Sequence, residues 1–86
     1  MGGDVAKIEK ALKRLCSKPT NFEWNELKAI MLHLGFELKT TGGSGRKFIN
    51  HETGAAHFIH EPHPSKVLKA YQVRDVVAFL TEEGYL

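Results

Sequence analysis

The period of the apolar residues changes at Gly35, and this change constrains the fold more than any other feature of the sequence. Before Gly35, apolar residues recur every three or four positions, as they do on one face of a helix. From Phe36 to Thr40, apolar and polar residues alternate, as they do along a half-buried strand. The sequence therefore predicts helices first and a sheet after them.

Two amphipathic helices are predicted before Gly35. The first spans Asp4–Ser17, with Asp4 as its N-cap and Pro19 beyond its end, and residues 1–3 are expected to be a disordered start. The second follows residues 22–24 and ends with Gly35 as a C-cap. The two apolar stripes consist of Val5, Ile8, Leu12 and Leu15, and of Leu27, Ile30, Met31 and Leu34.

Three short strands are predicted after Gly35, at residues 36–40, 47–51 and 55–60, separated by a glycine turn and by Glu52-Thr53-Gly54. Residues 61–65 are expected to form a loop, because Pro62 and Pro64 lack the amide hydrogens of a regular strand. A last helix starts at Ala70. The predicted fold class is α+β, a three-stranded antiparallel sheet with helices on one face and the other face partly open.

Length and composition limit the classes of function. The 86 residues form one domain without room for a second lobe or an internal cofactor, and the net charge of +2 is mildly basic. Cys16 is the only cysteine, so the chain suits a reducing cytosol, and we expect its thiol to pack in the apolar stripe beside Leu15. No apolar run approaches the roughly 18 residues of a membrane span, which predicts a cytoplasmic protein without a membrane partner.

The turn Gly42-Gly43-Ser44-Gly45 stands directly before two cations, Arg46 and Lys47. It is not a nucleotide-binding glycine loop, because no Gly-Lys-Ser/Thr follows and it does not lead from a strand into a helix. A plain β-turn is one reading. The other is an anion site, in which the two cations form a fork beside accessible amides of Gly43 and Ser44.

Further cations, Lys66 and Lys69, precede the last helix. If the helix start and the turn converge, these lysines join Arg46 and Lys47 in one basic edge that suits a nucleic-acid backbone. The competing interpretation is a set of scattered, solvated lysines.

Four of the five histidines lie in the second half of the chain, and three of them have the spacing His57-x-x-His60-x-x-His63. Residues three apart on a strand point to opposite faces, so this spacing does not predict a metal site. Histidine also serves as a general acid or base without metal, and His51, His57, His60 and His63 are candidates beside solvated polar alternatives. His33, between Leu32 and Leu34, is expected to be a surface or boundary residue of the second helix.

Taken together, the segments LGFEL, TGGSGRKF, IHEPHP and LKAYQVRDV resemble the HicA family of bacterial toxins. The resemblance covers residues 24–86, with residues 4–17 as an added N-terminal helix on a single domain of residues 4–86. It implies a fold like the double-stranded RNA-binding domain, α-β-β-β-α. It also implies an mRNA interferase, an endoribonuclease that needs no cofactor and no metal and is held inactive by a HicB antitoxin.

One position departs from the family pattern. Many members carry histidine where this chain has Gly45, and that histidine is their presumed catalytic residue. His60 and His63 are therefore the candidate catalytic residues here, because the resemblance places them before the last helix, and because His60 faces the open side if Ile59 faces the helices.

The leading hypothesis is a HicA-like toxin that binds mRNA and cleaves it with His60 or His63. Its RNA-binding residues are predicted to be Gly43, Ser44, Arg46, Lys47, Lys66 and Lys69. The alternative is a non-catalytic RNA-binding or protein-interaction module of the same fold, because Gly45 has no titratable group. A third interpretation is that the basic turn contacts only an acidic partner protein.

Overall fold

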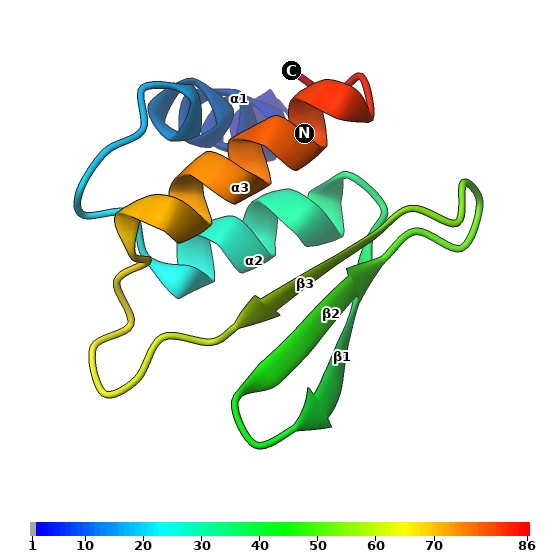
Figure 1. Ribbon diagram of the computed structural model, residues 1–86. Coiled ribbons are helices and arrows are strands. Elements are labelled where there is room, and N and C mark those ends of the chain that lie inside the picture. The colour runs from blue at the N-terminus through cyan, green and yellow to red at the C-terminus, as the bar shows by residue number, and fades with distance from the viewer. Residues whose placement is uncertain (1) are drawn as a thin grey trace.

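The computed structural model describes residues 2–86, with side chains from Ala6 onward. Three helices and three strands follow one another in the order α-α-β-β-β-α (Figure 1). They are α1 (Gly2–Cys16), α2 (Trp24–His33), β1 (Glu37–Gly42), β2 (Gly45–Ile49), β3 (Ala56–His60) and α3 (Ala70–Glu82). The predicted α+β class is confirmed, and the segment from α2 to α3 has the α-β-β-β-α order that the family resemblance implies.

Helix α1 differs from the prediction at both ends. It begins at Gly2, two residues before the predicted N-cap Asp4, while Met1, the first residue of the expected disordered start, lies outside the described residues. It ends at Cys16, and Lys18 with a φ of 52° follows. The prediction of a packed thiol was wrong: Cys16 is exposed, because only Leu15 of this pair faces the other helices. The two side chains differ in this way because successive residues of a helix point about 100° apart around its axis.

Helix α2 is fixed by local contacts at its two ends. The backbone N–H of Glu23 donates to Oε2 of Glu26 at 2.9 Å before the first turn. At the other end Gly35 has a φ of 96°, which favours glycine, and the Phe36 N–H donates to the carbonyl of Met31 at 2.9 Å. Gly35 therefore terminates the helix as predicted, one residue after the C-cap Leu34.

The sheet is an antiparallel meander in the order β1-β2-β3. The β1–β2 turn is two residues long, Gly43 and Ser44, and the register shifts at Thr41. Strand β2 starts at Gly45, two residues before the predicted start at Lys47. Glycine allows this longer ladder, because Gly42 adopts a φ of 112° and still pairs with Gly45.

One face of the sheet is covered and the other is open. Phe48 of β2 and Ile59 of β3 are buried on the covered face, where Trp24 of α2 contacts Phe48 with ring centroids 5.6 Å apart. The three helices lie on this side, and the turn between β1 and β2 projects away from them (Figure 1). Helix α1 packs on α2 and α3.

The core joins the helices to the covered face of the sheet. Burial of each large apolar side chain contributes about 1.5–3 kcal/mol. The core residues are Leu15, Phe22, Trp24, Leu27, Ile30, Met31, Phe36, Phe48, Ile59, Leu68, Val73, Val76 and Leu80. Within residues 2–86, none of the helices is both long enough and apolar enough to span a bilayer.

Candidate functional site

The open face of the sheet presents its side chains in rows that cross the three strands. Side chains alternate along each strand, so the residues opposite one another in the register share a face. Because Phe48 is buried against the helices, its neighbour Lys47 belongs to the open face. Gly45, two residues before Lys47, belongs to the same face. Two adjacent rows on this face are Lys39-Lys47-Phe58 and Gly42-Gly45-His60.

His60 lies at the glycine turn. Its Nδ1 is 3.1 Å from Oγ of Ser44, and its backbone pairs with Gly45 on β2. Hydrogen bonds fix the chain on both sides: Nε2 of Gln72 donates to the His60 carbonyl at 2.9 Å, and the Glu61 N–H donates to the Ser44 carbonyl at 2.8 Å. His60 is exposed while Ile59 is buried, which is the alternation predicted from the sequence.

Arg46 and Lys47 do not form the predicted fork. They are consecutive on β2 and therefore point to opposite faces. Arg46 donates to the carbonyls of Gly43 at 3.0 Å and Gly45 at 2.8 Å, so it braces the turn. Lys47 lies on the open face, with Nζ 5.6 Å from the ring centroid of Phe58.

Glu61 connects two of the predicted RNA-binding cations. Its carboxylate accepts a hydrogen bond from Nζ of Lys66 at 2.9 Å and forms an ion pair with Arg46 at 3.0 Å. The hydrogen bond from Lys66, assisted by the charge of Arg46, holds the pKa of Glu61 below its usual range against a smaller opposing effect of burial. Arg46 and Lys66 thus lie together as expected, but a carboxylate that sequence analysis did not single out lies between them.

The remaining predicted residues lie around this cluster. Lys69 is exposed at the N-cap of α3, where its backbone N–H donates to Oε1 of Gln72 at 3.0 Å. His63 is exposed in the loop between β3 and α3, next to the buried Pro62. The single basic edge of four cations is therefore not observed, because Lys47 lies on the open face and Arg46 on the covered one.

His57 occupies a different environment from His60. It points to the covered face, where its ring lies 5.0 Å from the ring of Phe79 on α3. Burial lowers the pKa of His57, and the charge of Asp75 opposes this shift only partly. The histidines three apart on β3 thus face opposite ways, as the strand period predicts. Within residues 2–86, no three side chains of metal-binding type are grouped closely enough to hold an ion.

A hollow of about 270 Å³ lies over the glycine row. Its lining residues are Thr41, Gly45, Arg46, Phe58, Ile59 and His60. A Cβ on Gly45 would collide with Oγ1 of Thr41 and would come within 3.1 Å of the Gly42 carbonyl. The family resemblance leads one to expect histidine at residue 45, but this backbone admits no side chain there unless Thr41 moves. The imidazole beside this position is that of His60 on β3.

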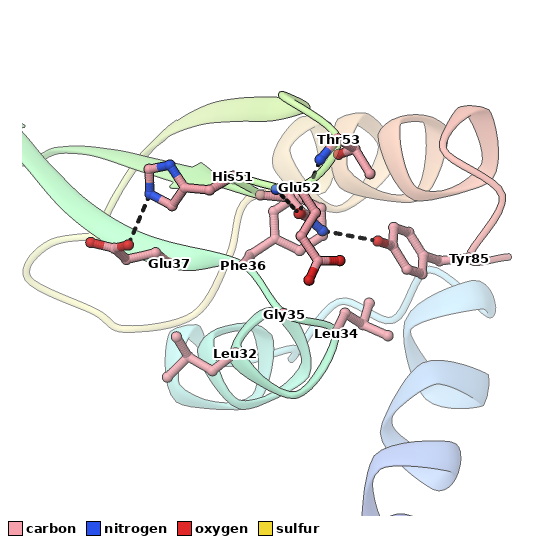
Figure 2. Close-up of a pocket in the computed structure, with 10 residues that line it drawn as sticks. Leu32, Leu34, Gly35, Phe36, Glu37, His51, Glu52, Thr53 and Tyr85 are labelled. Carbon is pink, nitrogen blue, oxygen red and sulfur yellow. Dashed lines mark hydrogen bonds and ion pairs between the residues drawn. The ribbon is translucent and has the colours of Figure 1, made fainter.

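A larger cleft of about 370 Å³ lies at the opposite end of the sheet, and Figure 2 shows its lining. Four of its polar side chains are already paired with one another. His51 and Glu37 are 2.9 Å apart (Figure 2). Nδ2 of Asn50 lies 3.2 Å from the hydroxyl of Tyr85.

The smaller hollow at the turn is the better candidate site, because the imidazole of His51 in the larger cleft is paired with Glu37, whereas His60 in the hollow contacts the neutral hydroxyl of Ser44. Phe58, which also lines the hollow, lies beside Lys47.

Two site residues escaped sequence analysis, Phe58 and Glu61. Phe58 is 67% exposed although it is an aromatic residue in the middle of a strand. The alternation with buried Ile59 is the signal that could have placed it on the open face. No local pattern predicts the position of Glu61, because its partners Arg46 and Lys66 depend on how β2 and the loop after β3 meet.

Comparison with known proteins supports the family resemblance. The family model described as the HicA toxin of bacterial toxin-antitoxin systems matches residues 24–84, more than two thirds of the chain. Searches of curated proteins and of solved structures each gave no significant match. The match begins with α2 and covers the whole sheet and α3, including the glycine turn and His60. The chain therefore belongs to the HicA family of toxins, which act in toxin–antitoxin pairs.

Proposed function

We propose that this toxin is an mRNA interferase, a metal-independent endoribonuclease of the cytoplasm that a HicB-type antitoxin neutralises. The observation that carries the proposal is the contact of 3.1 Å between His60 and Ser44 at the glycine turn. It puts an exposed imidazole beside a hollow on the open face of the sheet. A histidine in such a place can exchange protons with bound ribose.

His60 is proposed to act as the general base. In the tautomer that this role requires, Nδ1 carries the proton and donates to Oγ of Ser44, 3.1 Å away. The lone pair of Nε2 is then left for the proton of a ribose 2′-hydroxyl. The 2′-oxygen then attacks the adjacent phosphorus and the bond from phosphorus to the 5′-oxygen breaks. His63, in the loop that follows His60, is the candidate acid that protonates the leaving 5′-oxygen.

The cations around the turn are proposed to bind the phosphates. Lys47 on the open face and Lys69 at the start of α3 are exposed or half-buried, and the start of a helix also attracts anions. Arg46 and Lys66 are shared with Glu61, so they contribute less charge than two free cations. Gly43 and Ser44 at the turn allow ribose and phosphate to approach the backbone closely.

Incubation of purified protein with an mRNA transcript in the presence of a chelator tests this proposal. We expect cleavage by the unaltered protein, and loss of at least about 100-fold in rate for His60→Ala, in line with the contribution of a general base. His33→Ala, an exposed histidine on α2, is the matched control and should retain the rate. Intact RNA at high concentrations of unaltered protein would remove the enzymatic proposal.

The role of His63 and the antitoxin are tested separately. His63→Ala should also slow cleavage if His63 is the acid, whereas a rate equal to that of the unaltered protein would exclude His63 from that role. Induced expression should arrest growth, and co-expression of a HicB-type protein encoded by the adjacent gene should restore it. Arrest that this neighbour does not relieve would contradict the proposed pairing.

A non-catalytic RNA-binding module is the second candidate, and the closed Gly45 position favours it. That module would bind RNA with a strong dependence on salt and leave it uncut. The two candidates differ in one readout, the appearance of new RNA ends.

A further inference from the structure

Phe58 is exposed in a place where the fold gives no reason for it. It lies in the middle of β3, and 67% of its surface is accessible on the open face. An aromatic side chain left in water forgoes the favourable free energy of burial. Its neighbour in the sequence, Ile59, contributes to the core. The exposure of Phe58 therefore points to a ligand and not to packing.

The row that contains Phe58 is cationic. Lys39 and Lys47 lie directly opposite one another on β1 and β2, an arrangement of like charges that destabilises a sheet. Glu37 relieves it in part, 3.4 Å from Lys39. Lys47 extends over the Phe58 ring, with Nζ 5.6 Å from its centroid. The row thus joins an aromatic surface to positive charge, the combination that binds single-stranded nucleic acid.

The same ring borders the hollow over the glycine row. Phe58 and His60 are two residues apart on one strand, so they are adjacent on one face at a spacing of about 7 Å. Both line the hollow whose floor contains Gly45. A nucleotide whose base lies on Phe58 would therefore bring its ribose close to His60.

We propose that Phe58 stacks an unpaired base of the RNA next to the cleavage site, with Lys47 moving from the ring to a phosphate. The inference rests on the proposed function, since it places the substrate of that function. A base within a duplex has neighbours on both of its faces, so Phe58 can only stack on a base that is unpaired or displaced. The favoured substrate is single-stranded RNA, although the chain order resembles that of a double-stranded RNA-binding domain.

Fluorescence anisotropy with a short, labelled 2′-O-methyl RNA tests the inference, because the blocked 2′-oxygen prevents cleavage. Phe58→Leu keeps an apolar side chain but removes the aromatic face, and it should weaken binding of the single strand roughly 5- to 150-fold. Phe58→Trp keeps an aromatic face, so it should bind the single strand at least as tightly as the unaltered protein. The indole fluorescence should be quenched on addition of RNA. The same sequence as a duplex should bind more weakly and respond little to either substitution.

The matched control is Leu32→Ala, which removes a 49% exposed apolar side chain from α2, at the end of the sheet away from the glycine turn. It should leave binding unchanged, and circular dichroism should show that all variants are folded. If the unaltered protein binds the single strand and Phe58→Leu binds it equally well, the stacking proposal is overturned while RNA binding stands. If no protein binds either RNA, the proposed function fails together with it.

An antitoxin that covers the same face would give a different result. Phe58→Leu would then weaken binding of the HicB-type protein and leave RNA binding unchanged. That outcome would overturn the inference and assign Phe58 to the protein interface.

Discussion

At the scale of single residues, the close approach of Gly45 to Thr41 sets the chemistry of the turn. A Cβ at residue 45 would meet Oγ1 of Thr41, with the Gly42 carbonyl also close. We predict that Gly45→Ala lowers the free energy of unfolding by about 1–3 kcal/mol, the usual effect of overpacking. Thr41→Ala in the same chain should recover part of the loss, because it removes the oxygen that collides. Urea unfolding of both single variants and the double variant measures this coupling.

An equal loss in the two backgrounds would show that Thr41 is not the obstacle. The Gly42 carbonyl would then be the remaining cause, since a Cβ would lie 3.1 Å from it.

His57 is the residue that should make stability depend on pH near neutrality. Burial lowers its pKa in the folded chain below the ordinary value of 6.5. The unfolded chain therefore binds the proton of His57 more readily than the folded chain does. The stabilising contribution of the neutral, buried His57 is present above pH 6.5 and is lost as the pH falls through the lowered pKa. Asp75 on α3 favours the charged form and limits the effect. We predict that His57→Leu flattens the pH dependence of the unfolding free energy just below pH 6.5.

The control for His57 is His33→Gln, an exposed histidine on α2. It should retain the full pH dependence. Identical slopes for the unaltered protein and His57→Leu would assign the proton uptake to another group. The acidic groups with lowered pKa, Glu26, Glu37 and Glu61, lose their stabilising contributions only as the pH falls below their ordinary value of 4.5.

At the scale of elements, Glu61 links β2 to the loop between β3 and α3. Arg46 and Glu61 are each only about one fifth exposed, so their ion pair is better shielded from water than a surface pair. We predict that Glu61→Gln strengthens RNA binding and steepens its dependence on salt, because Arg46 and Lys66 become available to phosphates. Anisotropy titrations at several salt concentrations measure both effects.

Glu52→Gln changes the net charge equally and serves as the matched control for Glu61→Gln. Glu52 is exposed in the turn between β2 and β3, at the end of the sheet away from the glycine turn. An equal gain in affinity for the two variants would indicate a general effect of net charge. A gain confined to Glu61→Gln would locate the phosphate contacts at Arg46 and Lys66.

At the scale of the whole molecule, α1 supports the fold from the side away from the sheet. Leu15 is fully buried, and Arg14 is held by Glu26 of α2 at 3.0 Å, which further raises the pKa of the arginine. We predict that Leu15→Ala lowers the free energy of unfolding by about 2–5 kcal/mol without changing RNA cleavage by the folded fraction. Cys16 is the next residue and is exposed, so Cys16→Ala should change the free energy of unfolding by less than about 0.5 kcal/mol. Thermal unfolding and the cleavage assay together measure the separation.

The family match also supports the expectation that α1 affects stability and not cleavage, because the match begins at Trp24 and leaves α1 outside. Loss of cleavage by folded Leu15→Ala protein would mean that α1 also shapes the open face.

The sequence by itself determined the elements, their order and the glycine turn. Alternation at residues 36–40, the positive φ at Gly35 and the break at Pro62 follow from interactions between neighbours in the chain. Even here the strands extend further into the turn than alternation suggests, because Gly42 and Gly45 continue the ladder.

Only the tertiary structure decided which side chains meet. Ser44 and His60 are sixteen residues apart, and Arg46 reaches Glu61 across the same pair of strands. These contacts depend on the register between β2 and β3 and on the path of the following loop, to which the local hydrophobic pattern is insensitive. For the same reason the adjacent cations Arg46 and Lys47 separated onto two faces, while Phe58 came to lie beside Lys47.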